Sequence, residues 1–548
     1  MNKKTLKKKT KKNKKFPLIL GISLATTLMI GASAIYILFL HKKTEKIPLG
    51  AELIPQDAIM TLSVSTDSTQ WQQLKQFGTK QTQTVFQTQL NTLENNFLKV
   101  HGYNYEKDIK PWIGKQVTMA FLAPQISPQN AWVMILPIDN PLEAQKRLTQ
   151  NQSDNKTTFT ERNYQGTTIR ESGNNSSAEK PENQMISTTV IERSLIVTNN
   201  GKATEQIIDT YKNKKSLMTT AGYKESLGKI NSKNMFGQVY FNIPAMTGMT
   251  NTQAEKLAKI EARQGVITTI TLESEGIKFN GVSWLKPNSE KKITPANNSK
   301  IMPNLQPENT VITVSGGNLT QLWEDYSKNA DQNPIFPVTP DNIKKGIKSN
   351  LNLDFDTELS NWMKGEFSLS LVTIKQPKPG SLGASLAFMI KTSDRTQTES
   401  SLQKLEQFMS KRYQLKTEKT QIKGKEVIKW KSPLGIGMAN HGWLDNDVLF
   451  INLGADITES IIPKPAKSLV ENPLFKQTIR SELNPYNGYF FMDFDQTVNS
   501  GNIFLNRFIP NNIKPIVSGI KAIGVTAGIK DEQTTVFDIF VMLHKVQK

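Results

Sequence analysis

An internal repeat constrains this chain more than any other feature, because the second half of the sequence follows the first in the same order. The segment IPQDAIMTLSVSTDSTQW, which begins at Ile54, aligns with QPENTVITVSGGNLTQLW, which begins at Gln306. Trp112 aligns with Trp362, and later matches keep an offset of about 250 to 258 residues. Chance similarity would not keep register over such a length, so we infer a tandem duplication.

The two copies are predicted to occupy residues 51–290 and 303–548. The stretch KKITPANNSKIMPN between them is polar and contains two prolines, which is typical of a connection. Residues 291–302 are therefore predicted to be a linker. A second linker, residues 41–50, is predicted to precede the first copy.

The N-terminal part of the chain contains an uncharged apolar run, FPLILGISLATTLMIGASAIYILFL, over residues 16–40. About 20 apolar residues are enough to cross a bilayer as a helix. Nine lysines precede the run and three follow it, which predicts a cytoplasmic N-terminus. A cleaved signal peptide is the alternative, since Ala32-Ser33-Ala34 resembles a cleavage site, but its apolar region should be only about 7–15 residues long.

We therefore predict a single-pass protein of the inner (plasma) or thylakoid membrane, with most of the chain periplasmic or lumenal. Residues 1–15 would form a basic cytoplasmic tail at the membrane surface. Its lysines are Lys3, Lys4, Lys7, Lys8, Lys9, Lys11, Lys12, Lys14 and Lys15. Nucleic-acid binding is the other interpretation of such a run, but no aromatic residues are interleaved with these lysines. We predict a lipid bilayer as partner, and no nucleic acid.

Each copy reads as strands that come in adjacent pairs. Residues 60–65 alternate apolar and polar side chains, as a half-buried strand does, and the second copy keeps apolar residues at Ile312 and Val314. Asp67 and Asn318 are N-cap residue types and predict a helix after each strand. Regular strand–helix–strand alternation is absent. The predicted fold class is α+β: a single transmembrane helix, then two tandem, structurally similar, antiparallel-sheet-rich units.

Composition excludes several kinds of chemistry. The chain has no cysteine, which excludes disulfides, thiolate metal sites and a cysteine nucleophile. It has four histidines, and none pairs with another at ligand spacing, so we interpret His41, His101, His441 and His544 as surface or turn residues. The signatures G-x-S-x-G, H-E-x-x-H and G-x-x-x-x-G-K-[ST] are absent. We predict no catalytic residue, no cofactor and no metal site; whether the chain is an enzyme is left open, with a non-enzyme favoured.

Three acidic pairs could in principle share a cation: Asp354 with Asp356, Asp445 with Asp447, and Asp493 with Asp495. The first copy does not repeat them, and none has the glycine and glutamate of a calcium loop. We therefore interpret these acids as strand-end and turn residues.

The strand–cap–helix opening, the Trp112 segment, the N-terminal apolar run and the duplication together resemble a cyanobacterial family of membrane-anchored proteins catalogued as a domain of unknown function. The resemblance implies a membrane setting and no catalytic residue.

We hypothesise a non-enzymatic binding, assembly or scaffold protein with a membrane or extracytoplasmic protein partner. The alternative is an extracytoplasmic enzyme, or a small-ligand or polymer receptor, with its site between the two repeats. Exposed Trp132, Trp284 and Trp443 could then stack on sugars, although burial is the more common fate of an indole.

Overall fold

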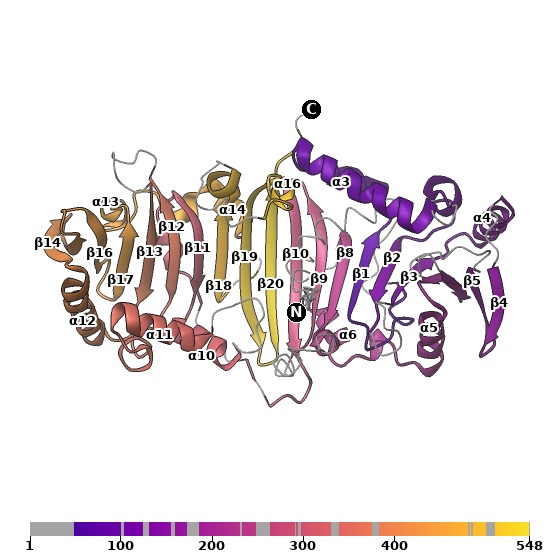
Figure 1. Ribbon diagram of the computed structural model, residues 1–548, viewed down its shortest axis with the longest axis horizontal. Helices are drawn as coiled ribbons and strands as arrows, with labels where there is room; N and C mark the ends of the chain where they lie inside the picture. Colours follow the sequence, from indigo (N-terminus) through magenta and orange to yellow (C-terminus); the bar gives the residue numbers. More distant parts are fainter. Residues whose placement is uncertain are drawn as a thin grey trace, which may run out of the picture.

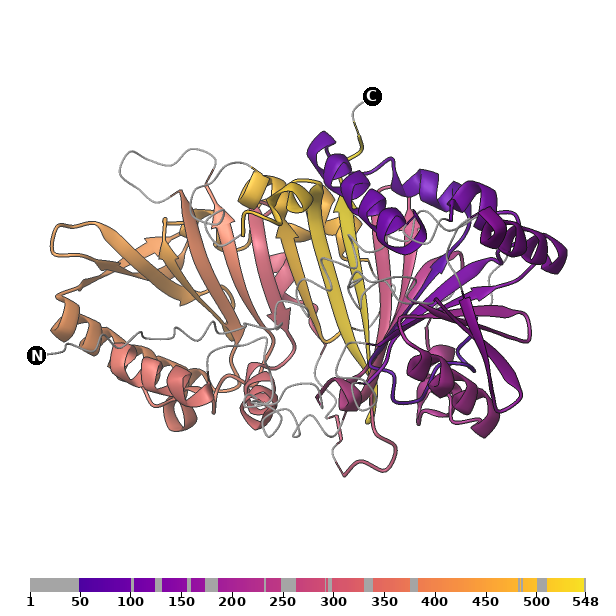
Figure 2. The same cartoon turned by 45° about the vertical axis from the view of Figure 1, so that its right-hand side comes forward.

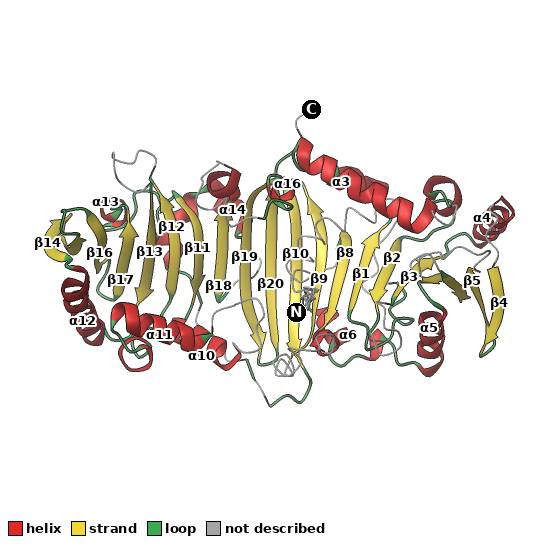
Figure 3. Ribbon diagram, viewed as in Figure 1, coloured by secondary structure: helices red, strands yellow, loops and turns green. Residues whose placement is uncertain are grey.

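The computed structural model describes residues 49–99, 103–123, 131–154, 159–172, 186–230, 233–247, 263–290, 292–293, 298–329, 339–374, 383–480, 483, 486–499 and 510–546. We call the described residues up to 290 unit 1 and those from 298 onward unit 2. Across these ranges, twenty strands form one continuous antiparallel sheet (Figures 1 and 3).

The strands of unit 1 are β1 (Met60–Ser65), β2 (Gln116–Phe121), β3 (Trp132–Pro137), β4 (Phe159–Tyr164), β5 (Thr167–Ser172), β6 (Ser187–Ile191), β7 (Ser194–Thr198), β8 (Met235–Asn242), β9 (Arg263–Glu273) and β10 (Gly276–Leu285). Those of unit 2 are β11 (Thr310–Gly316), β12 (Phe367–Thr373), β13 (Ala384–Lys391), β14 (Lys416–Ile422), β15 (Lys425–Lys431), β16 (Gly437–Trp443), β17 (Val448–Gly454), β18 (Gly488–Asp493), β19 (Ile520–Asp531) and β20 (Thr534–Leu543).

The helices and helical turns of unit 1 are α2 (Ser68–Leu74), α3 (Lys80–Leu93), η2 (Glu94–Leu98), η4 (Tyr105–Ile109), α4 (Pro141–Asp154), α5 (Gly201–Asn213), η6 (Leu217–Thr219), α6 (Tyr223–Gly228) and α7 (Ile243–Thr247). Those of unit 2 are α9 (Met302–Leu305), α10 (Leu319–Asn329), α11 (Pro340–Leu351), η9 (Phe355–Leu359), α12 (Arg395–Tyr413), α13 (Thr458–Ile461), η10 (Leu469–Glu471), α14 (Pro473–Thr478), η11 (Asp495–Asn499) and α16 (Lys514–Val517).

The strand order is the same in both units. From its outer edge inward, unit 1 runs β4-β5-β6-β7-β3-β2-β1-β8-β9-β10. Unit 2 runs β14-β15-β16-β17-β13-β12-β11-β18-β19-β20. Their last strands, β10 and β20, pair with each other and join the units into one sheet. The two halves are thus arranged about an approximate two-fold axis at the centre of Figure 1.

A short helical turn before the aligned tryptophan recurs in both units. Asn104 caps η4 and Asp354 caps η9, and each cap accepts a hydrogen bond from a backbone N–H of the first turn. The indole N–H of Trp112 donates to the carbonyl oxygen of Asp108, and that of Trp362 donates to the carbonyl oxygen of Glu358 at 2.8 Å. A buried indole usually has such a partner, and in both units the turn before the aligned tryptophan supplies it.

Both faces of the sheet carry apolar clusters. One face packs against α5, α6, α13 and α14 through residues such as Tyr223 and Phe475. The opposite face packs against α2 and α3 in unit 1 and against α10, α11 and α12 in unit 2. Figure 2 shows α3 and α11 on this second face, near opposite edges of the sheet. We call it the α3/α11 face, and it carries the candidate site.

The predicted fold class is wrong. No helix in the described ranges is long and apolar enough to cross a membrane, and the two predicted units share one large sheet instead of forming separate ones. The same finding contradicts the predicted single-pass membrane localisation. The apolar run at 16–40, the basic tail at 1–15 and most of the linker at 41–50 lie outside the described residues. The boundaries proposed at 51–290, 291–302 and 303–548 stay predictions.

Candidate functional site

The residues singled out from the sequence do not come together in the structure. The nine lysines of the N-terminal tail, His41 and His101 lie outside the described residues. Within the described ranges, no three His, Asp or Glu side chains are grouped so that they could hold a metal ion. A different arrangement, on the α3/α11 face of unit 2, offers a binding surface.

His441 is not a turn residue, contrary to the sequence-based interpretation. It lies within β16, is 4% exposed, and places Nε2 2.9 Å from Oε1 of Glu406 on α12. The ring of Trp430 packs edge-on against it. His544 is half-buried and pairs with Asp495 at 2.8 Å. Both histidines therefore link neighbouring elements of the fold.

The acidic residues considered as cation ligands make separate local contacts instead. Asp354 caps η9, and hydrogen bonds from Thr357 lower the pKa of its carboxyl. Asp447 pairs with Lys391 at 3.3 Å, and Asp493 is 2% exposed and accepts the backbone N–H of Gln496. These contacts agree with the interpretation of the acids as turn and strand-end residues.

The three tryptophans considered as sugar platforms do not form one. Trp284 is 3% exposed and donates its indole N–H to the carbonyl oxygen of Ala221. Trp132 and Trp443 are half-buried, and the guanidinium of Arg395 lies 4.3 Å from the ring centroid of Trp443. These side chains lie on different strands of different units.

The candidate site begins with a row of apolar side chains that face solvent on four neighbouring strands of unit 2. Val314 and Leu369 face each other on β11 and β12, and Leu386 and Leu453 face each other on β13 and β17. These four side chains are 41%, 41%, 42% and 48% exposed. Partly exposed neighbours complete the contiguous surface, which we call the apolar strip: Ile312, Val314, Leu369, Leu371, Leu386 and Leu453.

The exposure of the side chains on this face rises along the strands, from the end that α11 and α12 cover to the end that carries the strip. At the other end of the same face, Phe367, Ile390 and Leu449 are directly paired and are 5%, 0% and 0% exposed. They pack under helices α11 and α12 through residues such as Leu351 and Leu405. Figure 1 shows these helices at the lower ends of the strands. The strip is the part of the sheet that α11 and α12 leave uncovered.

Unit 1 covers the two strip positions that lie on its first strand. The repeat aligns Leu62 with Val314 and Met60 with Ile312, and Leu62 and Met60 are 7% and 6% exposed. They belong to a cluster that includes Trp71 of α2 and reaches Phe86 of α3. These two positions are therefore covered by helices of the chain itself in unit 1, whereas in unit 2 Val314 is exposed and Ile312 is half-buried.

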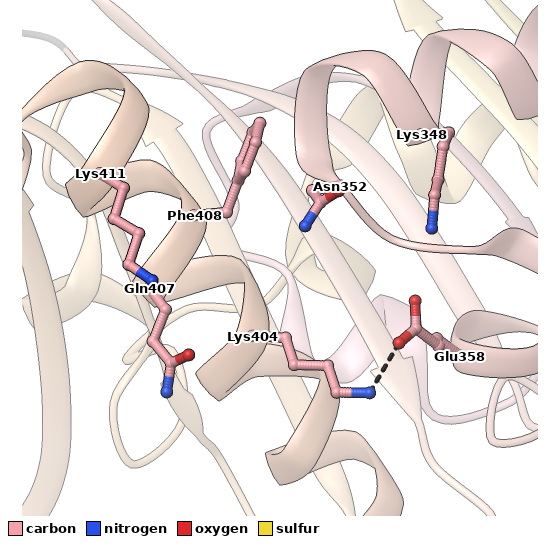
Figure 4. Close-up of a pocket in the computed structure, with 7 residues that line it drawn as sticks. All are labelled: Lys348, Asn352, Glu358, Lys404, Gln407, Phe408 and Lys411. Carbon is pink, nitrogen blue, oxygen red and sulfur yellow. Dashed lines mark hydrogen bonds and ion pairs between the residues drawn. The ribbon is translucent and has the colours of Figure 1, made fainter.

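A basic hollow of about 340 Å³ lies between α11, η9 and α12, the elements that pack over the covered end of this sheet face. Figure 4 shows Lys404 and Glu358 facing each other in it, with Nζ and Oε1 2.7 Å apart. Glu358 also accepts the backbone N–H of Asp354, and these two bonds hold its pKa below the usual value. Lys348 and Lys411 form no ion pair with another described residue. The remaining lining residues are Asn352, Gln407 and Phe408.

The arrangement suits binding more than catalysis. The hollow is open to solvent and holds three lysines and one carboxylate that is already paired. No nucleophile with an adjacent base lies among its lining residues. An exposed apolar surface with a charged border is the usual composition of a protein-binding surface.

The sequence pattern predicts a strand at Ile312 and Val314, but it does not identify the strip as a site. The alternation in β11 and β12 predicts one buried face, and nothing in it tells whether a helix covers that face. The repeat held a usable signal, because the connections within the aligned helix pairs, α2 with α3 and α10 with α11, differ in length. Five residues separate α2 from α3, whereas ten separate α10 from α11.

Comparison with known proteins gives a family but no function. No curated protein matches the chain. Among solved structures, crystal form I of TP0453 is 11% identical, covers 46% of this chain and 82% of its own, and has a TM-score of 0.26. Crystal form III of TP0453 is 10% identical, with 45% and 83% covered and a TM-score of 0.25. A family model described as "Protein of unknown function (DUF3352)" matches residues 18–543, and the chain belongs to that family.

Proposed function

We propose that this chain is a non-enzymatic binding or assembly protein, and that the apolar strip of unit 2 binds an acidic amphipathic helix of a partner protein. The observation that carries the proposal is the exposure of two directly facing pairs of apolar side chains on four neighbouring strands, on a sheet face that helices cover elsewhere. Exposed apolar groups in a contiguous patch are costly in water, and such patches are commonly binding sites.

The form of the partner is inferred from unit 1. There, the matching face is covered by α2 and α3, which place Trp71 and Phe86 against Met60 and Leu62. A helix that presents large apolar side chains at spacings of three and four residues would cover the strip in the same way. A helix also pairs its own backbone groups, so it can lie on the sheet without an unsatisfied edge.

The charge of the partner is inferred from the basic hollow between the helices at the covered end of the same face. Lys348, Lys404 and Lys411 line this hollow, and the one acid there, Glu358, is paired with Lys404. Acidic side chains on the flank of a bound helix would complement these lysines, and lysines would be repelled. The chain carries a formal net charge of +20, which also favours an acidic partner.

The alternative function, an enzyme or receptor with a site between the repeats, has weaker support. The described hollow lies within unit 2 and not between the units. At the junction the two units are joined by a continuous ladder of β10 with β20. A screen of small anions and sugars by thermal shift would favour this alternative if a ligand raised the melting temperature and a junction variant abolished the effect.

The cellular setting rests on the sequence resemblance. We propose a cyanobacterial origin on that resemblance, and a membrane or extracytoplasmic protein as the partner.

A peptide titration tests the proposed function on the full chain. The probe is a fluorescent 18-residue helix with leucine on one face and glutamate on the other, measured by anisotropy. We expect saturable binding that weakens at least tenfold in the double variant Leu386→Ser, Leu453→Ser. Leu434→Ser is the matched control, since Leu434 is 87% exposed and lies outside the strip, and should bind as the unmodified chain does.

Two further outcomes decide the matter. A probe with lysine in place of glutamate should bind at least tenfold more weakly than the acidic probe, and Lys348→Glu with Lys411→Glu should reverse that order. Binding that is equal for both probes, or that is insensitive to the strip substitutions, would contradict the proposal.

A further inference from the structure

The junction between the units is built like the interface of a two-fold symmetric dimer. In unit 1, Thr269 of β9 faces Asn280 of β10, and in unit 2, Thr526 of β19 faces Asp538 of β20. Asn280 and Asp538 are therefore equivalent positions, and they face each other where β10 pairs with β20. In an isologous interface an equivalent pair of this kind lies on the symmetry axis.

The residues on either side of this pair follow the same symmetry. Phe279 faces Ile539, and Gly281 faces Phe537. Because Phe279 is equivalent to Phe537 and Gly281 to Ile539, the two-fold symmetry relates one pair to the other. At one end of the ladder, the backbone N–H of Leu285 donates to the carbonyl oxygen of Gln533 at 2.9 Å. At the other end, the backbone N–H of Leu543 donates to the carbonyl oxygen of Glu275 at 3.0 Å.

Two ion pairs cross the junction at corresponding places in the two units. Lys229, which follows α6, lies 2.9 Å from a carboxylate oxygen of Asp531 at the end of β19. Arg480, which follows α14, pairs with Glu273 at the end of β9. Each unit therefore contributes one cationic and one anionic side chain to these ion pairs, as two copies of a single ancestral interface would.

Other contacts make the two sides unequal. A Cβ on Gly281 would lie 1.9 Å from the ring of Phe537, so this ring occupies space that a side chain would need. The equivalent position in unit 2 carries Ile539. Asn280 donates from its amide to the carboxylate of Asp538, a bond that two identical acids could not make.

The first helices of unit 1 add a contact that reaches across to the C-terminal part of unit 2. The hydroxyl of Thr82 donates to the carbonyl oxygen of Pro515 at 2.9 Å, and Thr79 and Ser518 lie within hydrogen-bond distance at 3.2 Å. The backbone N–H of Gly78 donates to the carbonyl oxygen of His544 at 2.7 Å.

We propose that the β10–β20 junction is a self-sufficient protein–protein interface that selects the unlike unit. Unit 1 and unit 2 hold together without the covalent linker, and unit 2 rejects a second copy of unit 2. A pair of two unit 2 chains would place Asp538 against Asp538, and like charges directly opposite each other on neighbouring strands repel. It would also place Phe537 against Ile539 twice, where the native interface has glycine on one side.

Cleavage of the intact chain tests this proposal. A protease site inserted after Asn297, in the segment between the units, is cut in the purified full-length protein, and the product is examined by native mass spectrometry at decreasing concentration. We expect one complex that contains one copy of each fragment, and no complex of two unit 2 fragments. Fragments that separate at micromolar concentration would overturn the proposal. It would also be overturned if pairs of unit 2 fragments formed as often as random association of the fragments predicts.

Substitutions separate specificity from stability. Asp538→Asn with Ile539→Gly makes the unit 2 edge resemble that of unit 1, and it should produce pairs of unit 2 fragments after cleavage. Asp531→Lys should weaken the association, so that the fragments separate at a concentration at least tenfold higher. Adding Lys229→Asp should restore most of the lost affinity. Failure of the second substitution to rescue the first would contradict the assigned ion pair, whether or not the cleaved chain stays together.

Discussion

Val314 of β11 and Leu369 of β12 lie directly opposite each other on the α3/α11 face, and each keeps 41% of its surface in contact with solvent. Two residues further along β12, in the covered direction, Phe367 is 5% exposed. This step from covered to uncovered within a single strand marks the edge of the apolar strip. Paired apolar side chains at the centre of a sheet are usually buried.

The position of a leucine along β17 should decide what its loss costs. Leu449 is 0% exposed under α12, so Leu449→Ala is expected to lower the free energy of unfolding by about 2–5 kcal/mol. Leu453→Ala, four residues along the same strand and 48% exposed, should cost less than about 1 kcal/mol. Urea denaturation of both variants checks this. Equal losses would show that the strip is covered in solution.

The indole bond to the preceding turn should be measurable. Trp362 donates to the carbonyl oxygen of Glu358, so Trp362→Phe is expected to lower the free energy of unfolding by about 1–3 kcal/mol. Trp430 is a matched control, because it is 4% exposed and its indole nitrogen has no partner among the described residues. Trp430→Phe should therefore cost clearly less in the same denaturation experiment. The reverse order would refute the assignment.

Acid should weaken the turn that ends at the basic hollow. Bonds from the Asp354 backbone and from Lys404 lower the pKa of Glu358, so its contribution to stability is complete above the unfolded value of about 4.3. That contribution is lost as pH falls through the lower pKa of the folded state. Glu358→Gln should flatten the decline of stability below pH ~4.3, measured as the urea midpoint. The control Glu399→Gln, at a side chain 47% exposed, should leave the curve unchanged.

Gln238 offers a substitution that should stabilise the protein. Its side chain lies on β8, is 2% exposed, and neither its amide nitrogen nor its oxygen has a partner among the described residues. A buried amide without partners costs about 1–3 kcal/mol. Gln238→Leu is expected to raise the melting temperature, and Ser63→Ala, which breaks a buried bond to Thr118 on the neighbouring strand, should lower it. A fall in both variants would mean that Gln238 is satisfied in solution.

Local features were predictable from the sequence where a residue acts on its neighbours along the chain. The strand predicted at 60–65 is confirmed as β1, and the N-cap predicted at Asp67 accepts the backbone N–H of Thr69. The predicted family, a domain of unknown function, is confirmed by the match over residues 18–543. Its implied cyanobacterial origin stays a prediction. The predicted single-pass membrane localisation is wrong, because none of the helices in the described ranges could span a membrane.

The rest depended on contacts between distant segments. The pairing of β10 with β20 joins residues 258 positions apart, such as Asn280 and Asp538, and no local pattern encodes it. The sequence predicts a surface or turn residue at His441, yet Glu406 on a separate helix fixes it inside a strand. The apolar strip was missed because helix coverage depends on where α11 and α12 end, and a periodic strand pattern does not report that.

Photo-crosslinking in the cells of origin tests the central claim most directly. A benzoyl-phenylalanine side chain replaces Leu386 in the strip, or the exposed control Leu434, in the full-length chain. The account predicts one discrete protein adduct from position 386, with the crosslinked peptide in an acidic amphipathic segment, and no such adduct from position 434. The account would be contradicted if position 386 gave no crosslink, or gave the same adducts as position 434. A crosslink from position 386 to this same chain would also contradict it.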